Sequence, residues 1–222
     1  MSSNLKIKRI CAWCGKEFIA QKTTTACCSK QCANALYKKR KRDEAIKANN
    51  QIVEKKIDEK TLRELVDIAR NTPSAANRQP LQYRLVCDDE TNSRVYDCLG
   101  WAGYYKDWDG PVAEERPSAY IIMVTPQDVN PQWDEGIAGQ TILLAAAEQG
   151  LGGCFIGNIR KEKLAGVLNL PEGYKVDLCI ALGYPKEEVV LEDIAGDGDI
   201  HYYRDDNQVQ HVPKKKLDDI LI

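Results

Sequence analysis

The chain has 222 residues, which is enough for one sizeable core or for a medium domain plus a small module. Hydrophobic residues make up 43% and charged residues 29%, an ordinary balance for a soluble globular protein. The longest apolar run, ILLAAA at 142–147, is far too short to span a membrane, so we expect no membrane partner. The net charge of −2 conceals an asymmetry, because residues 1–50 hold 12 Lys and Arg against 3 Asp and Glu, whereas the rest holds 19 against 30. Two parts with different partners are therefore expected.

The nine cysteines do not form a disulfide framework. Five lie between residues 11 and 32 and the other four are scattered singly. This distribution favours a reducing, cytoplasmic location. The start, MSSNLKIKRIC, carries charge but has no apolar stretch behind it, so no signal peptide is visible.

The clustered cysteines predict a small zinc module over residues 1–36. Four of them form two close pairs, separated by 13 residues: Cys11, Cys14, Cys28 and Cys32. Two thiolate pairs at this separation can close a tetrahedral zinc site. Cys27 competes with Cys28, but its spacing to Cys32 is poorer. The alternative is a set of buried free thiols, although about 30 residues rarely build a core without such a link.

The module resembles the treble-clef type of zinc-binding module, through its CxxCGKxF…CSxxC pattern. Similar modules begin some small bacterial DNA-binding proteins. The basic run KKRKR follows at 38–42, within a stretch at 37–56 that we interpret as a basic helix or linker. This run leaves a nucleic-acid partner open. The alternative is a solvated, charged surface.

A larger domain is expected over 57–222, and it begins with an amphipathic helix at 58–71. Leu62, Leu65, Val66 and Ala69 recur on one helical face, and Asp58 is in position to cap the first turn.

Strand and helix patterns then alternate. Strands are predicted at 81–87, 118–125, 153–157 and 175–185, and helices at 135–150 and 159–170. The first of these helices is expected to begin after Asp134 and to end at Gly150, and the second to stop at Pro171. A layered α/β or α+β domain follows, with the strand directions open.

The segment NTPSAANRQP at 71–80 is unusual for a simple turn. It places three small residues and two carboxamides between two prolines. An ordinary polar turn is the plain alternative, because Asn and Pro are common in turns.

Four stretches in order resemble the nitroreductase family of FMN-dependent oxidoreductases, and the resemblance covers about residues 57–222. They are LRELVDIARNTPSAANRQPLQYRLV, DEGIAGQTILLAAAEQGLGGCFIG, VDLCIALGYPKEE and VPKKKLDDIL. The resemblance implies an α+β fold, with a central sheet flanked by helices. It also implies that NAD(P)H donates a hydride to bound FMN and that a small acceptor, such as a nitroaromatic or a quinone, then takes the electrons in a ping-pong cycle.

By this resemblance, the 71–80 segment holds the flavin ring. Ser74, Ala75 and Ala76 would form low walls beneath the ring. Asn77 would donate and accept hydrogen bonds at the pyrimidine edge or the ribityl chain, with Gln79 beside it.

The resemblance also assigns the turn CFIGN at 154–158 to the flavin N5 edge. A backbone N–H of Gly157 or Asn158 would point at N5, the atom that accepts hydride, so these two residues are the catalytic candidates. A tight turn between structural elements accounts for the glycine equally well.

The FMN phosphate needs cations, and the resemblance places Lys214 and Lys215 near it. A solvent-facing KKK run is the alternative. The family's usual RRSxR-like segment should fall at 45–51, which here reads AIKANNQ. We expect this loss to weaken FMN binding unless Arg40 and Arg42 substitute.

The resemblance also implies assembly, because family members pair as homodimers with each flavin between two subunits. The aromatic segment 101–108 is expected to be either a lid over the site or part of the core. The alternative function is a nucleic-acid-binding or regulatory protein that acts through the zinc module, with a degenerate flavin domain.

Overall fold

The computed structural model describes residues 7–20, 25–53, 56–105, 108–196 and 198–222, and it describes their side chains except those of 42–53 and Gln132. The chain divides into two compact units, residues 1–54 and residues 55–222, and each is described by itself. Among the described residues, no helix combines the length and the apolar character needed to cross a membrane.

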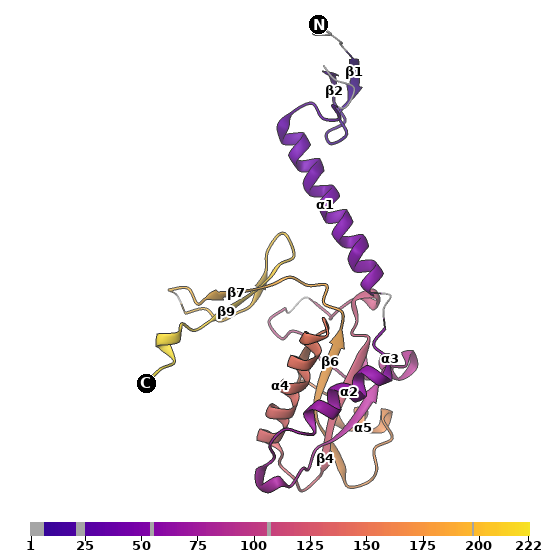
Figure 1. Ribbon diagram of the computed structural model, residues 1–222, viewed down its shortest axis with the longest axis vertical. Helices are drawn as coiled ribbons and strands as arrows, with labels where there is room; N and C mark the ends of the chain where they lie inside the picture. Colours follow the sequence, from indigo (N-terminus) through magenta and orange to yellow (C-terminus); the bar gives the residue numbers. More distant parts are fainter. Residues whose placement is uncertain (1–6, 21–24, 54–55, 106–107, 197) are drawn as a thin grey trace. The chain divides into compact units, whose positions relative to one another are not determined.

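The N-terminal unit consists of a small hairpin followed by one long helix (Figure 1). The antiparallel strands β1 (Ile7–Ile10) and β2 (Glu17–Ala20) pair from Ile7 opposite Ala20 to Ile10 opposite Glu17. The helix α1 (Lys30–Val53) contains the basic run at 38–42 as well as residues 45–51. The segment expected to be a basic helix or linker is therefore helical over most of its length.

The second unit is built on a four-stranded sheet in the order β3-β4-β6-β5. Its strands are β3 (Gln82–Val86), β4 (Ala119–Pro126), β6 (Tyr174–Gly183) and β5 (Gly152–Ile156). Every neighbouring pair is antiparallel, which answers the question of direction that the sequence left open. The central strand β4 is buried from Ala119 to Thr125, as its continuous apolar run predicts.

Helices cover both faces of this sheet (Figure 1). They are α2 (Glu59–Ala69), α3 (Asp89–Tyr96), α4 (Gln132–Glu148) and α5 (Lys161–Val167). Alternate residues of β4 point to opposite sides. Ile121 and Met123 pack in a core with α2 and α4, whereas Tyr120 and Ile122 pack in a second core with α3 and α5. The predicted α+β class, with a central sheet flanked by helices, is confirmed.

The amphipathic helix predicted at 58–71 is α2, and Asp58 caps it by accepting a hydrogen bond of 2.8 Å from the Thr61 backbone N–H. By contrast, the expected start of α4 is wrong. The helix begins at Gln132, because the Pro131 carbonyl already accepts the first helical hydrogen bond, 2.9 Å from the Glu135 nitrogen. Asp134 therefore lies inside the first turn. At the other end, Gly150 follows the helix with a φ of 72°, as expected for a residue that ends a helix.

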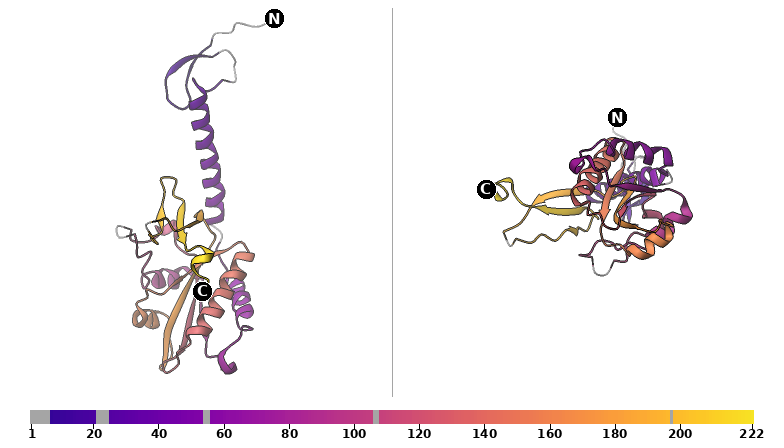
Figure 2. Two further views of the ribbon diagram at one scale, coloured as in Figure 1. Left: turned by 90° about the vertical axis from the view of Figure 1, so that its left-hand side faces the viewer. Right: turned by 90° about the horizontal axis from the view of Figure 1, so that it is seen from below.

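The described residues from β7 to the C-terminus form an arm that stands beside the helices and the central sheet (Figure 2, in yellow). Its sheet contains β7 (Val189–Asp193), β9 (Gln210–Lys214) and β8 (Tyr203–Arg204), with β7 and β9 parallel. The described residues also contain short 3₁₀ turns at Ala75–Asn77, Ala113–Glu115 and Leu217–Asp219. The strand β7 was not predicted from the sequence, and the helix predicted at 159–170 ends earlier, because α5 stops at Val167.

Candidate functional site

The 71–80 segment is a strained loop that connects α2 to β3. Ala76, Asn77 and Gln79 adopt φ angles of 51°, 55° and 49°, in the left-handed region that residues other than glycine rarely occupy. Each such residue costs free energy, and the conformation persists only where its surroundings enforce it. A simple polar turn does not need three of them within four positions.

A buried carboxylate holds this loop in place. The Ser74 hydroxyl donates to Oδ2 of Asp134 at 2.6 Å, and the Ala75 backbone N–H donates to Oδ1 at 3.3 Å. The Gln79 backbone N–H in turn donates to the Ser74 hydroxyl oxygen at 2.9 Å. Asp134 is only 8% exposed, and its place in the first turn of α4 lets the helix dipole stabilise its charge. From the sequence, Asp134 was expected only to precede the helix, and no role in the site was assigned to it.

The two carboxamides of the loop bind each other and remain exposed. The Gln79 Nε2 amide donates to the Asn77 side-chain Oδ1 at 3.0 Å and to the Asn77 backbone carbonyl at 3.2 Å. Within the part of the chain that the structure describes, the Asn77 Nδ2 amide and the Gln79 Oε1 carbonyl have no partner. The pair therefore presents one free donor and one free acceptor to the solvent.

The turn after β5 carries the other expected flavin contacts. The Asn158 carbonyl accepts from the Gly100 N–H at 2.8 Å, and a Cβ at Gly100 would overlap the Asn158 amide. A Cβ at Gly157 would meet nothing within 4 Å, so open space lies beside this residue. In the described part of the chain, the N–H groups of Gly157 and Asn158 have no acceptor, and both remain free to donate.

The loop and this turn lie at opposite edges of the sheet. The loop leads into β3 and the turn follows β5, and these strands are the two edges of the sheet. With strands about 4.8 Å apart, the two edges are separated by about 14 Å. One chain therefore places the loop and the turn about three strand spacings apart.

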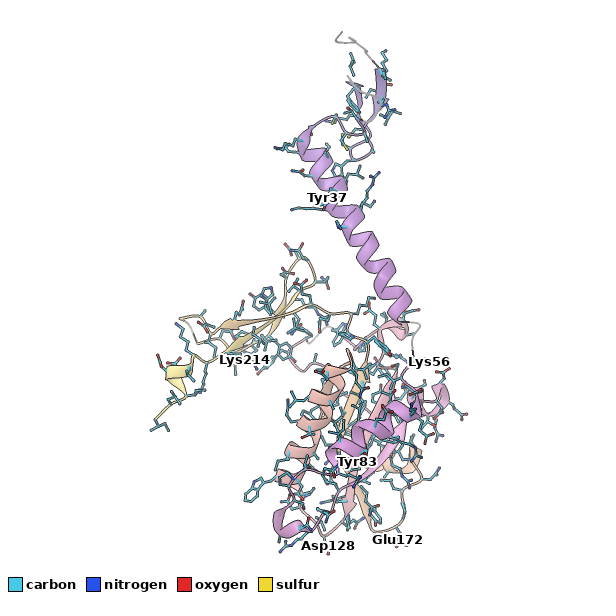
Figure 3. The ribbon with its side chains drawn as sticks, in the orientation of Figure 1. Tyr37, Lys56, Tyr83, Asp128, Glu172 and Lys214 are labelled. Carbon is cyan, nitrogen blue, oxygen red and sulfur yellow. The ribbon has the colours of Figure 1, made fainter. Side chains whose placement is uncertain are left out.

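The tail lysines lie on the arm. Lys214 ends β9, where its carbonyl accepts from the Ile194 N–H at 2.9 Å, and the side chains of Lys214 and Lys215 are exposed. Figure 3 shows Lys214 on the arm, well apart from Tyr83 in the strand that follows the loop. The structure thus does not bring these lysines to the loop of the same chain.

Two other parts of the chain concern the phosphate: Arg160, a basic residue close to the turn after β5, and the segment 45–51. Arg160 donates from Nη2 to the Asp97 backbone carbonyl, where it anchors the start of α5. Residues 45–51, in place of the family's arginine segment, are part of α1, and their side chains lie outside the described residues, as does that of Arg42.

The aromatic segment packs against the arm. Tyr104 and Tyr105 lie 4.8 Å and 5.3 Å from the Tyr202 ring, centroid to centroid. The Tyr105 hydroxyl donates to Gln210 Oε1 at 2.6 Å, and the Arg204 guanidinium lies over the rings of Tyr105 and Trp108. These contacts attach the arm to the domain. Residues 106 and 107 of the segment lie outside the described residues.

A polar hollow of about 440 Å³ opens beneath residues 127–131, close to the start of α4. Lys175, one of its lining residues, donates to the Val129 carbonyl at 2.5 Å and lies 3.7 Å from the Asp177 carboxylate. None of the predicted site residues lines it.

The predicted metal ligands come together in the N-terminal unit. The Sγ atoms of Cys11, Cys14, Cys28 and Cys32 all lie within 4.8 Å of one another. Cys27, the competitor of Cys28, is buried and is not a member of this cluster.

Comparison with known proteins assigns the larger unit to a family. The model of the nitroreductase family matches residues 53–184, which is more than half of the chain. The chain belongs to the nitroreductase family. The family named from the sequence is thereby confirmed, while the fourth stretch, VPKKKLDDIL at 212–221, lies beyond the matched region.

Individual relatives agree with this membership. A protein of Archaeoglobus fulgidus with the provisional name NADH dehydrogenase/NAD(P)H nitroreductase is 25% identical over 61% of this chain and 78% of its own length. A protein of Methanothermobacter thermautotrophicus with the same provisional name is 27% identical over 71% of this chain and 84% of its own. An FMN-dependent nitroreductase from Clostridium difficile R20291 shares the fold with a TM-score of 0.50 and 23% identity, over 60% of this chain and 80% of that one. The nitroreductase family is one of oxidoreductases, and the 71–80 loop lies within the matched region.

Proposed function

We propose that the protein is an FMN-dependent oxidoreductase that passes electrons from NAD(P)H to a small acceptor, such as a nitroaromatic or a quinone, in a ping-pong cycle. Family membership supports the reaction class. The observation that carries the proposal is the strained 74–79 loop, which a buried carboxylate fixes and which presents free amide groups. Strain that the surrounding structure maintains is typical of binding and active sites.

The residues present fit the ring of FMN. The pyrimidine edge of a flavin carries both donors and acceptors, and the Asn77–Gln79 pair offers a free Nδ2 donor and a free Oε1 acceptor. Small side chains at Ala75 and Ala76 leave room for a flat ring beside them, and the N–H groups of Gly157 and Asn158 would donate to its other edge. When bound, FMN supplies the hydride-accepting atom and stores the two electrons between the half-reactions.

We further propose that two copies of the chain form each site. The loop and the turn lie at opposite edges of one sheet, so a pocket with both needs the loop of one subunit and the turn of another. The helix α4 offers a surface for this pairing, because Trp133, Ile137 and Leu144 are 79%, 42% and 63% exposed. These residues recur along one face of α4 at helical spacing. A two-fold homodimer would use this face twice and create two equivalent sites.

The phosphate is assigned to the arm. Lys214 and Lys215 are exposed cations in the stretch that resembles the family's phosphate-binding segment. In a homodimer, the arm could contact the flavin site formed with either subunit. This assignment needs no arginine segment at 45–51.

Flavin binding by the purified full-length chain tests the proposal. Added FMN is expected to lose its fluorescence on binding with about one FMN per chain, and the complex to be bleached anaerobically by NADH or NADPH, then reoxidised by a quinone. Initial rates with both substrates varied should give the parallel reciprocal plots of a ping-pong cycle. A chain that binds neither FMN nor riboflavin under these conditions would refute the proposal and favour the degenerate flavin domain.

A further inference from the structure

The N-terminal unit contains a thiol cluster that the oxidoreductase reaction does not use. The Sγ atoms of Cys14 and Cys28, and those of Cys28 and Cys32, are 3.6 Å apart, and with Cys11 all four lie within 4.8 Å. A disulfide requires an S–S distance of about 2.05 Å. Four sulfurs around one Zn²⁺, each about 2.3 Å from the metal, form a tetrahedron with edges of about 3.8 Å. The observed spacing fits a shared metal ion and not a pair of disulfides.

A tight backbone turn brings the thiols of the first pair, Cys11 and Cys14, close together. Cys11 and Cys14 lie in the turn between β1 and β2, where the Gly15 N–H donates to the Cys11 carbonyl at 3.0 Å. Gly15 adopts a φ of 71°, which glycine tolerates without strain. The Cys11 N–H then donates to the Lys16 carbonyl at 2.9 Å and closes the turn. The turn is thus fixed by backbone hydrogen bonds.

The second pair lies at the start of α1. Cys28 comes just before the helix and Cys32 lies in its first turn, where the Cys32 N–H donates to the Ser29 hydroxyl at 3.1 Å. The Cys28 N–H points back to the Cys11 sulfur at 3.4 Å. Backbone N–H groups stabilise negatively charged sulfur, so this contact suits a metal-bound thiolate. It also links the hairpin to the residues just before α1 within the thiol cluster.

The unit has little else to hold it together. Its buried apolar residues in the described part of the chain are only Cys11, Ala20 and Cys27. About 50 residues with so small a core need a further link to fold stably. Cys27 does not supply it, because its side chain lines a separate hollow next to Leu36 and Tyr37.

The charge of the unit suits a thiolate site. Four thiolates around one Zn²⁺ leave roughly two net negative charges. Residues 1–50 carry 12 Lys and Arg against 3 Asp and Glu, so the surrounding field is positive. A positive field favours the deprotonated thiolates that a metal requires.

We propose that Cys11, Cys14, Cys28 and Cys32 bind one Zn²⁺ as a closed, structural site that folds the N-terminal unit. The metal displaces the four thiol protons and joins the hairpin turn to the first turn of α1. All four positions of the tetrahedron are occupied by protein sulfur, which leaves none for water or a substrate. The site therefore acts on folding and takes no part in the flavin reaction.

Metal analysis of the full-length chain, purified with a thiol reductant and without chelator, tests this site. We expect about one zinc per chain, and four equivalents of a mercurial thiol reagent to release it. Cobalt exchanged into the site should show sulfur-to-metal charge transfer and the intense visible bands of tetrahedral coordination. Less than about a fifth of one zinc per chain, even after reconstitution with zinc and reductant, would overturn the proposal.

Single substitutions identify the ligands. Cys14→Ser and Cys32→Ser should each lose the zinc, whereas Cys27→Ser, next to a proposed ligand and equally conservative, should keep it. Loss of zinc from Cys27→Ser together with its retention by Cys28→Ser would refute the assigned ligand set. If the ligand variants precipitate, the cobalt spectrum and the mercurial release of the unaltered chain decide the matter. FMN binding by soluble Cys14→Ser should equal that of the unaltered chain, so the zinc site and the flavin site can fail separately.

Discussion

Ser74 donates its hydroxyl hydrogen to the Asp134 carboxylate at 2.6 Å, although the two residues are 60 positions apart in the chain. This contact joins the loop before β3 to the first turn of α4. The same hydroxyl oxygen accepts from the Gln79 N–H, so one side chain fixes both ends of the strained segment.

Removal of the anchor should release the loop. A hydrogen bond to a charged group contributes about 1.5–3 kcal/mol, so Asp134→Asn and Ser74→Ala should each lower the free energy of unfolding by about 1–3 kcal/mol. FMN affinity should fall at least about tenfold, because the free amides lose their fixed positions. Urea unfolding and FMN fluorescence quenching measure the two effects.

The control for the anchor is Asp128→Asn, which changes an exposed aspartate near the same helix. It should leave both quantities unchanged. Unaltered FMN affinity in Asp134→Asn would show that the loop does not bind the flavin.

The carboxamides should contribute directly to flavin binding. Asn77→Ala removes the free donor and also the acceptor for Gln79, so we expect FMN and riboflavin affinities to fall together by about tenfold. Asn71→Ala is the matched control, since this amide donates instead to the Asp67 carbonyl at 2.6 Å. If the two variants bind FMN equally well, Asn77 has no part in the site.

The tail lysines should act on the phosphate alone. Lys214→Ala combined with Lys215→Ala should weaken FMN by more than about tenfold and leave riboflavin almost unchanged, because riboflavin carries no phosphate. Added salt should weaken FMN binding more than riboflavin binding, since the lost interaction is electrostatic. The control Lys60→Ala removes an exposed cation from α2. Equal losses for FMN and riboflavin would show a structural effect and redirect the search for the phosphate site to Arg40 and Arg42.

The exposed face of α4 should hold two subunits together. Light scattering of the unaltered chain at micromolar concentration should give the mass of a dimer. Leu144→Glu places a charge on this face and should produce monomers with much weaker FMN binding. Ile68→Glu changes a similarly exposed aliphatic residue on α2 and should remain dimeric. A monomeric unaltered chain that binds FMN tightly would contradict the shared site.

Much of the fold follows from local patterns. The spacing of Leu62 and Leu65 predicts α2, the continuous apolar run around Ile121 predicts a buried β4, and Asp58 caps its helix as expected. Spacing also favoured Cys28 over Cys27, and Cys28 is the residue in the cluster.

The remainder depends on contacts that local patterns do not contain. Strand direction is decided by packing, so the antiparallel sheet stayed open. The strand β7 was not predicted, because its parallel partner β9 lies about twenty residues further along the chain. The hydrogen bond between Ser74 and Asp134 could not be predicted either, because the local sequence around each residue does not indicate the other as its partner. The separation of the loop from the Gly157 turn follows from the strand order and so required the structure.

Subunit complementation tests the shared flavin site most directly. Asn77→Ala impairs the loop, and Gly157→Leu fills the open space at the turn, so each variant alone should bind FMN poorly. When the two variants are co-expressed with different tags and purified as mixed dimers, one pocket should combine an intact loop with an intact turn. We expect these dimers to bind about one FMN tightly and the bound FMN to be reduced by NAD(P)H. Mixed dimers that bind FMN no better than either variant alone would contradict the shared flavin site.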